Sequence, residues 1–445
     1  MQENENEVTT NRIRIIILII LFFSLITCAY SQSKIAGYWK GTMMRDGSSM
    51  DVSFDFKMQN NSLLGFFNSP SQKASGIPLN NLQNTNDSLS FSLMSEPVTI
   101  FNCKIYDDKI NGEIIQEGFT NGVLTLKHSE PPPVKFSFID TSFKSGNHNI
   151  ACRIYFPMTP GKHPAVVFLH GSGGEGMFAY QYFAEQFASR GIVTLIQDKQ
   201  GTGKSTGDWT KANFDDLAND YINAVNFLMN FDKVNKSQIG IYGHSQGGTL
   251  APLVASKSKD ISFVIAAASI GDSVYKQDLY RVEINLRAND FKPAEISEAI
   301  DYYKSWLDMA RTGNGFEKLD SINNSSKEKK WFEWVEAPPK DHWIWKYYSE
   351  TGNYNSLDYW KLTTVPVLLV YGENDQIEDV KNYLKNIEGA LTGQSHNPDV
   401  TKMILPNARH NLCIFPEKND KFFWWHLFPH YVDSLISWIL LRFKN

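Results

Sequence analysis

A serine between glycines is the first feature of this sequence that could do chemistry. The run Gly243-His-Ser245-Gln-Gly-Gly248 follows an apolar, strand-like segment at 238–242 and precedes a helical pattern from Thr249 to Ser256. A sharp strand-to-helix turn needs glycines beside the serine, because the neighbouring backbone leaves space only for hydrogen there. Such a turn would expose the Ser245 hydroxyl at the positive end of a helix, as a nucleophile requires. A serine that merely caps the helix is the alternative.

A second glycine-rich run could supply the hydrogen-bond donors that such a nucleophile needs. His170-Gly-Ser172-Gly-Gly174 directly follows the apolar segment 165–169. Backbone N–H groups stabilise the negative oxygen that forms when a hydroxyl attacks a carbonyl, and glycines let the chain approach that oxygen closely. We expect the amides of Ser172 and Gln246 to be the two donors, and an ordinary glycine-rich turn is the alternative.

A carboxylate and a histidine that could activate the serine come from two later segments. Asp375 follows the carboxyl end of a buried, strand-like run, where the catalytic groups of parallel sheets gather, and Glu373 and Asp379 are its nearby competitors. His410 lies in the loop after the strand-like segment 402–405. We expect a structural role for other histidines, namely His163, His244, His396, His426 and His430.

These motifs, in the chain order Ser, Asp, His, resemble the α/β-hydrolase superfamily over residues 135–445, and in particular its bacterial esterases and prolyl-oligopeptidase-like hydrolases. The loop from Asp198 to Ser205 resembles a further motif of that family, although Gln200 stands where the family has arginine. The resemblance favours Asp375 over its competitors. It implies that His410 takes the Ser245 proton during attack and that water later releases an acyl enzyme.

Phosphate, metal and nucleic-acid chemistry are not expected. Gly203-Lys-Ser-Thr206 is similar to the end of a phosphate-binding loop, but Asp198 stands where that pattern requires glycine. The sequence has no metal-ligand spacing, so we expect no cofactor. A net charge of −5 gives no reason to expect nucleic acid or a nucleotide as partner.

The 445 residues predict two structural units. Short alternating runs with frequent turns predict an antiparallel β domain at 32–130, and the Gly37-Tyr-Trp39 start resembles lipocalin-like barrels. A barrel and a sandwich both fit this pattern. After Pro131-Pro132-Pro133, continuous apolar strands alternate with helices across 134–445, which predicts an α/β-hydrolase fold with a mostly parallel sheet and helices on both faces.

An aromatic-rich insert at 272–360 lies where this fold carries its lid. A helical cap with many tryptophans and tyrosines would favour an apolar acyl or aryl group in the substrate. Alternatively, these aromatic side chains form the core of the cap itself.

The first 31 residues predict export. Arg12 and Arg14 precede a short apolar run, as in a secretory signal, and Cys28 offers lipidation as an alternative. Membrane contact is expected only through that segment. A Cys103–Cys152 disulfide is conceivable, but buried thiols are the simpler reading. The aromatic run from Phe422 to Phe428 is expected to pack against the sheet together with the helical pattern that follows it.

The function that the sequence predicts is hydrolysis of small acyl or aryl esters. A prolyl-oligopeptidase-like peptidase or amidase is the first alternative. A lipid- or glycan-binding protein built on a hydrolase scaffold is the second.

Overall fold

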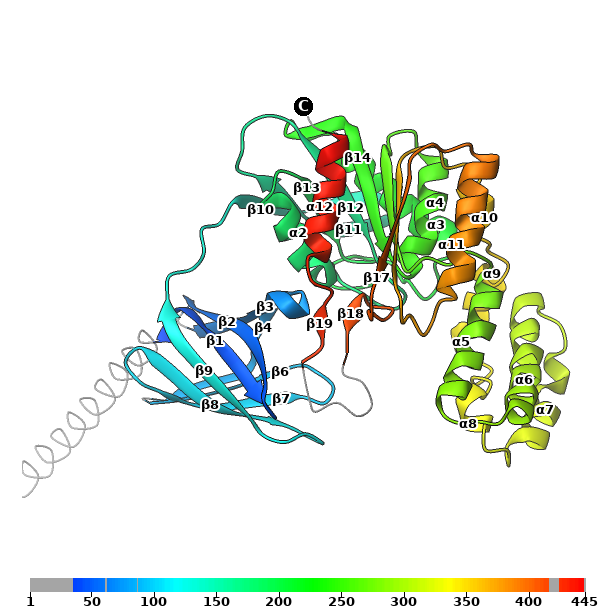
Figure 1. The fold of residues 1–445 in the computed structure, drawn as a ribbon, viewed down its shortest axis with the longest axis horizontal. Coiled ribbons are helices and arrows are strands. Elements are labelled where there is room, and N and C mark those ends of the chain that lie inside the picture. The colour runs from blue at the N-terminus through cyan, green and yellow to red at the C-terminus, as the bar shows by residue number, and fades with distance from the viewer. Residues whose placement is uncertain (1–34, 61, 86, 416–423, 444–445) are drawn as a thin grey trace, which may run out of the picture. The chain divides into compact units, whose positions relative to one another are not determined.

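The computed structural model describes residues 35–60, 62–85, 87–415 and 424–443 and divides into two compact units (Figure 1). Of these described residues, those up to Pro133 together with Phe415 and 424–426 form unit 1, and the others form unit 2. The expected signal at 1–31, with Cys28, lies outside the described residues. No helix in the described ranges is long and apolar enough to cross a membrane.

Unit 1 is a single antiparallel sheet in the strand order β4-β3-β2-β1-β9-β8-β7-β6-β5, nearly closed on itself. One nearly closed sheet, rather than two packed sheets, favours the barrel over the sandwich. The strands are β1 (Gly37–Arg45), β2 (Ser48–Gln59), β3 (Ser62–Ser69), β4 (Ala74–Pro78), β5 (Asn80–Thr85), β6 (Ser88–Leu93), β7 (Thr99–Ile105), β8 (Lys109–Gln116) and β9 (Gly122–Ser129).

The alternating side chains of these strands build the core of unit 1. Phe54, Phe91 and Phe101 are almost completely buried and pack ring to ring, with Phe91 and Phe101 stacked 4.7 Å apart. Trp39 is 1% exposed and donates a hydrogen bond to the Ile35 carbonyl. The tryptophan near the start of the domain is therefore a core residue.

The sequence suggested that Trp424 and Trp425 belong with the sheet of unit 2, but the structure assigns both residues to unit 1. The Arg45 guanidinium lies 5.1 Å from the ring centroid of Trp424, and Gln72 donates a hydrogen bond to the Trp425 carbonyl. Phe422, at the start of the aromatic run, lies outside the described residues.

Unit 2 contains an eight-stranded sheet in the order β10-β11-β13-β12-β14-β15-β16-β17. Strands β12 to β17 run parallel, but β10 pairs with β11, and β11 with β13, in antiparallel fashion. The sheet is therefore mixed. Its strands are β10 (Phe136–Ser145), β11 (His148–Pro157), β12 (His163–Leu169), β13 (Val193–Gln197), β14 (Val234–His244), β15 (Phe263–Ala267), β16 (Val367–Gly372) and β17 (Val400–Leu405).

Helices cover both faces of this sheet, which explains why β12, β13 and β15 are buried along their whole length. Helices α2 (Gln181–Ala188) and α12 (Tyr431–Arg442) pack together on one face (Figure 1). Helices α3 (Phe214–Leu228), α4 (Gln246–Lys257) and α11 (Val380–Gly389) lie on the other. The short strands β18 (Cys413–Ile414) and β19 (His426–Leu427) pair separately.

The insert between β15 and β16 is helical and forms a cap of its own. Its two ends lie side by side, because Ser273 and Asn355 form an antiparallel bridge and Val274 donates a hydrogen bond to the Tyr354 carbonyl. Its helices are α5 (Val274–Ala288), α6 (Pro293–Thr312), α7 (Leu319–Ser326), α8 (Phe332–Val335), α9 (Ile344–Thr351) and α10 (Leu357–Trp360).

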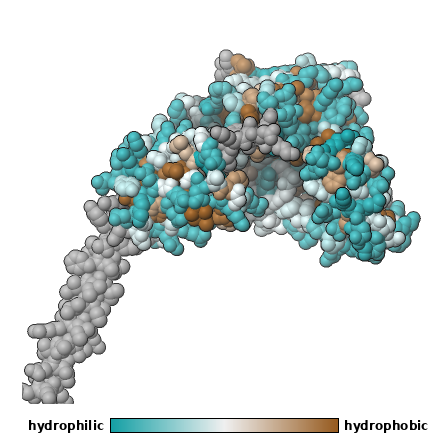
Figure 2. All heavy atoms as spheres, turned by 60° about the horizontal axis from the view of Figure 1, so that its bottom comes forward, coloured by the Kyte–Doolittle hydropathy of each residue, from teal (hydrophilic) through white to brown (hydrophobic). Residues whose placement is uncertain are grey.

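The aromatic residues of the cap divide between two environments. Trp306 is 4% exposed, donates a hydrogen bond to the Val335 carbonyl and packs against Trp345, so it belongs to the cap core. Trp343 and Tyr347 line a cavity of unit 2 instead. Figure 2 shows hydrophilic residues over most of the visible face, with separate apolar patches.

The three cysteines of the described ranges are buried, Cys103 in unit 1 and Cys152 and Cys413 in unit 2. Burial raises the pKa of both Cys103 and Cys152 to about 12. Cys103 and Cys152 form no disulfide.

Candidate active site

Ser245 lies in a strained turn between β14 and α4. Its backbone φ of 56° is in the left-handed region, which residues other than glycine and asparagine seldom adopt. A Cβ at Gly243 would lie 2.2 Å from the Gly247 backbone, and one at Gly247 would lie 2.4 Å from the Leu169 carbonyl oxygen. Only glycine fits at either position, as the sequence predicted. The turn holds the Ser245 side chain at the carboxyl end of the sheet.

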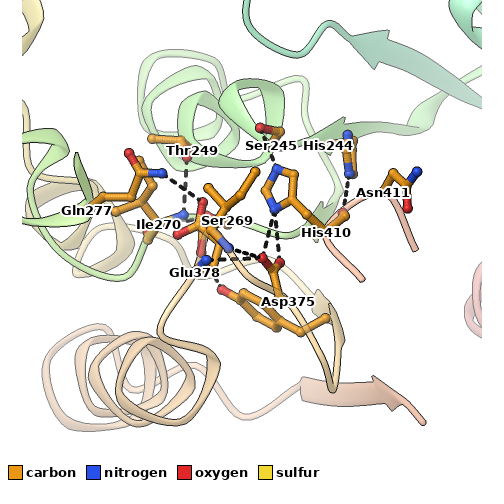
Figure 3. A network of polar contacts seen from close by, with 12 residues as sticks. His244, Ser245, Thr249, Ser269, Ile270, Gln277, Asp375, Glu378, His410 and Asn411 are labelled. Atoms are coloured by element: carbon orange, nitrogen blue, oxygen red, sulfur yellow. Dashed lines mark hydrogen bonds and ion pairs between the residues drawn. The ribbon is translucent and has the colours of Figure 1, made fainter. Parts of the chain in front are cut away.

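The structure brings His410 and Asp375 to this serine (Figure 3). His410 Nε2 lies 3.0 Å from Ser245 Oγ, and His410 Nδ1 lies 2.9 Å from one Asp375 oxygen and 3.2 Å from the other. Since a carboxylate only accepts hydrogen bonds, Nδ1 carries the proton and Nε2 is free to accept the hydroxyl proton of Ser245. The arrangement can move a proton from the serine to the histidine.

Asp375 is held in place by backbone amides. Its Oδ1 accepts hydrogen bonds from the N–H groups of Ile377 and Glu378, at 2.8 and 3.0 Å, and its side chain is completely buried. The two competing carboxylates have other partners: Glu373 accepts from the Asn407 amide, and Asp379 caps α11. Of the three, Asp375 is the one that contacts His410.

His244, for which the sequence indicated a structural role, lies beside the site. Its Nε2 lies 2.8 Å from the backbone carbonyl oxygen of His410, and the two rings are 5.3 Å apart. The residue directly before the serine therefore fixes the loop that carries the histidine. Its position inside the glycine turn was the signal for such a role.

Ser172 and Gln246 both line the cavity above Ser245. Gln246 is the first residue of α4, so its N–H has no acceptor within the helix. The amides just before Ser172 are already engaged, because His170 donates to the Tyr221 hydroxyl and Gly171 to Glu175. The two predicted donor residues thus lie in one cavity with the serine, on the loop and the helix that flank it.

Lys199 connects the loop that carries Ser172 to Gln246 at the start of α4. The position of Lys199 in the sequence did not predict these contacts. Its Nζ donates hydrogen bonds to the carbonyls of Gly171 and Gly173, at 2.8 and 2.9 Å, and to Gln246 Oε1 at 3.0 Å. Lys199 is 2% exposed, and burial lowers its pKa to about 8, against the opposing charge of Glu175. Only the tertiary structure shows that this lysine points inward.

The cavity has a volume of about 460 Å³ and joins the sheet edge to the cap. Its wall is largely aromatic and apolar near Trp209, Phe214 and Trp343, with the rings of Trp209 and Trp343 packed edge to face 5.4 Å apart. Charged side chains lie at Lys199, Asp278 and Arg281, and the carboxyl group of Glu378 also lines the cavity. The described residues contain no cluster of metal-ligating side chains.

Known proteins with similar sequences and folds include several esterases. The chain is 24% identical over 250 residues to the esterase EstD of Thermotoga maritima, which covers 53% of each protein. It is 26% identical over 135 residues to the quorum-quenching protein AidA of Acinetobacter baumannii, covering 30% of this chain and 44% of that protein. The chain spans about half the length of these curated relatives. A solved esterase from Pyrococcus furiosus matches 70% of this chain and 93% of its own, with 17% identity and a TM-score of 0.45.

A family model matches the part of the chain that builds this site. Residues 146–411 match the model of the X-Pro dipeptidyl-peptidase (S15) family, a stretch that covers more than half of the chain and contains Ser245, Asp375 and His410. The chain therefore belongs to the X-Pro dipeptidyl-peptidase family S15, within the α/β-hydrolase superfamily.

Proposed function

We propose that this protein is a serine hydrolase that cleaves carboxylic esters of small acyl or aryl groups. The observation that carries the proposal is the chain of contacts from Ser245 Oγ to His410 Nε2, and from His410 Nδ1 to Asp375. This is the geometry of a nucleophile, a general base and the group that orients the base. The fold alone would not have been enough, because function resides in the site.

The reaction would proceed by acyl transfer. His410 accepts the Ser245 proton as the oxygen attacks the ester carbonyl, and the amides of Ser172 and Gln246 stabilise the negative oxygen that results. His410 then gives its proton to the leaving alcohol. In the second half, His410 activates a water molecule that releases the acid from Ser245. Asp375 keeps the imidazole in the required tautomer throughout.

The cavity supports a small substrate with an apolar or aromatic part. Its volume of about 460 Å³ falls within the usual size of small-molecule sites, and Trp209, Trp343 and Tyr347 form much of its wall. Because Trp343 and Tyr347 come from the cap, the insert at 272–360 is expected to act as a lid that shapes the entrance.

The family match favours a second candidate, a dipeptidyl-peptidase or related amidase. The same three residues would attack an amide, but the leaving amine needs more complete protonation than an alcohol, which makes ester hydrolysis the easier reaction. The esterases among the similar proteins also favour the ester. The two candidates differ in rate toward matched ester and amide substrates.

The test is covalent labelling combined with turnover. We would treat the protein with a fluorophosphonate probe and measure hydrolysis of a short aryl ester and of an X-Pro aryl amide, alongside Ser245→Ala. Loss of both labelling and turnover in Ser245→Ala, with Ser325→Ala unchanged, is the expected result, because Ser325 is an exposed cap serine. Labelling that persists in Ser245→Ala would refute the assignment. Amide turnover as fast as ester turnover would favour the peptidase.

A further inference from the structure

Glu378 forms part of the cavity wall and has no evident role in proton transfer. It lies three residues after Asp375 and is 2% exposed. One carboxyl oxygen, Oε1, accepts a hydrogen bond from Gln277 Nε2 at 3.4 Å (Figure 3). The other, Oε2, is buried and has no hydrogen-bond partner within the described residues. Buried polar atoms in native proteins nearly always have a hydrogen-bond partner, so we expect Oε2 to bind one that comes from outside the chain.

The environment of the Glu378 carboxyl favours its neutral form, which can donate a hydrogen bond. Burial raises its pKa well above the usual value, and the charges of Asp375 and Asp278 raise it further. A neutral carboxyl carries one O–H. Since Oε1 accepts from Gln277, Oε2 is the oxygen that the neutral form leaves available to donate.

Helix α5 places a second donor in the same cavity. Gln277 and Arg281 are one helical turn apart on that helix and both line the cavity. Arg281 uses Nε and Nη2 on Asp278, and Nη2 also donates to the Tyr303 hydroxyl. For Nη1 the part of the chain that the structure describes offers no hydrogen-bond partner, and the side chain is 39% exposed.

The Asp278 carboxylate in this region already has partners for both of its oxygens. Asp278 accepts from Arg281 with one oxygen and from the Tyr348 hydroxyl with the other. What the cavity offers here is therefore hydrogen-bond donors, the Glu378 O–H and the Arg281 N–H, rather than a free negative charge. Because the Asp278 carboxylate is already paired with Arg281, it is not free to bind an ammonium group.

We propose that Glu378, Gln277 and Arg281 form a subsite that binds an oxygen acceptor on the substrate, remote from the ester bond that is cleaved. A ketone, hydroxyl or carboxylate on the acyl group has this chemistry, and an alkyl or ammonium group does not. The inference rests on the proposed function, because it assigns the acyl group to the cavity above Ser245. It narrows the substrate from small acyl esters in general to those with an oxygen function along the chain.

The test compares aryl esters of matched length and shape. We would measure kcat/KM for esters of pentanoate, of its keto analogue levulinate, of succinate as the monoester, and of γ-aminobutyrate, together with the homologue of each that is longer by a methylene. A binding site discriminates strongly against an analogue that leaves its buried donors unpaired. We therefore expect kcat/KM for the levulinate or monosuccinate ester to exceed that for the pentanoate ester by about tenfold or more. Equal values for the keto and alkyl esters would overturn the proposal.

Two variants of Glu378 test whether a hydrogen-bond donor is needed at this position. In Glu378→Gln the amide N–H replaces the O–H, so the preference for the oxygen-bearing ester is expected to persist. In Glu378→Met the ratio of the two kcat/KM values is expected to fall toward one. Glu317→Met, at an exposed cap glutamate outside the cavity, is the matched control and should keep the wild-type ratio. A preference for the ammonium ester that is lost in Glu378→Gln would show a cation site instead.

Binding keeps the inference testable without turnover. In Ser245→Ala, calorimetric titration with levulinate and pentanoate should show tighter binding of levulinate, and the difference should disappear when Glu378→Met is added. Fluorophosphonate labelling of every variant that retains Ser245 reports an intact site. Labelled protein without a keto preference would refute this subsite alone, whereas absence of labelling and turnover in the wild type would refute the proposed function.

Discussion

Asp375 and His410 are 35 residues apart in the chain, yet the Nδ1 atom of His410 lies 2.9 Å from an oxygen of Asp375 whose side chain is fully buried. The contact joins the loops that follow two neighbouring parallel strands, β16 and β17. Because Asp375 is also fixed by two backbone amides, it has little freedom to turn away from the imidazole. The histidine is thereby held with Nε2 toward Ser245.

Replacing this carboxylate by an amide should disable the histidine without changing its position. In Asp375→Asn the side chain can donate to Nδ1, which favours the tautomer with the proton on Nε2, and we expect kcat to fall about 10⁴-fold. The pH dependence of ester hydrolysis for wild type and variant is the measurement. Glu373→Gln is the control, since Glu373 contacts the Asn407 amide and not His410. A loss of less than about tenfold in Asp375→Asn would contradict the assigned role.

Removal of the Lys199 ammonium should loosen the loop that carries Ser172. In Lys199→Met the carbonyls of Gly171 and Gly173 lose their shared donor, and we expect kcat to fall by about ten- to a hundredfold with a smaller change in KM. Lys204→Met, at an exposed lysine of the same region, is expected to leave both constants unchanged.

Because the pKa of Lys199 is lowered, alkaline pH should reduce kcat but increase the contribution of Lys199 to stability. Wild-type kcat should decline as pH rises through about 8, where Lys199 loses a proton, and this decline should be absent in Lys199→Met. The pKa of Lys199 is lower in the folded than in the unfolded chain, so the unfolded chain binds more protons between about pH 8 and the ordinary lysine pKa. Its contribution to stability therefore rises with pH in that window. Thermal unfolding of both proteins across this range checks the sign.

Gly247 should tolerate no side chain. A Cβ there would lie 2.4 Å from the Leu169 carbonyl oxygen, a backbone atom that cannot move without displacing β12. We expect Gly247→Ala to cost about 1–3 kcal/mol of stability and most of the activity. Gly389→Ala is the matched control, since nothing lies within 4 Å of its Cβ position at the end of α11. Chemical denaturation and fluorophosphonate labelling would report the two effects.

Because Trp306 and Trp343 lie in different environments, replacing the first should reduce stability and replacing the second should weaken substrate binding. Trp306→Ala removes a buried side chain from the cap core, and we expect a loss of about 3–5 kcal/mol in stability. Trp343 is 39% exposed and packs edge to face against Trp209 in the cavity wall, so Trp343→Ala should mainly raise KM for aryl esters with little change in melting temperature. Equal melting temperatures for the two variants would contradict this division of the cap.

The parts of the site that the sequence predicted are those encoded locally. The turn at Ser245 depends on glycines within three residues of it, and Asp375 and His410 follow recognisable strands in an order typical of the fold. Lys199 and Glu378 could not be predicted in this way, because their burial depends on segments far away in the chain. A lysine within a polar loop is usually exposed.

The same distinction explains the differences in fold. The apolar segments of β10 and β11 indicate strands, but strand direction depends on the connection and the neighbour rather than on hydrophobicity, so the mixed sheet was not foreseen. Trp424 and Trp425 precede a helix of unit 2, and only the three-dimensional arrangement assigns them to unit 1. The choice between barrel and sandwich likewise depends on how closely the edge strands β4 and β5 approach each other.

The bridge between Ser273 and Asn355 closes the two ends of the cap insert on each other, next to the end of β15. A segment that enters and leaves a fold at the same point can vary in length and sequence with little entropic penalty and without disturbing the strands around it. Under the proposed function, exchange of this one module would alter the cavity wall around Trp343 and Tyr347 and leave Ser245, Asp375 and His410 in place. The stem at Ser273 and Asn355 is the natural junction for grafting the cap of a related hydrolase onto this sheet.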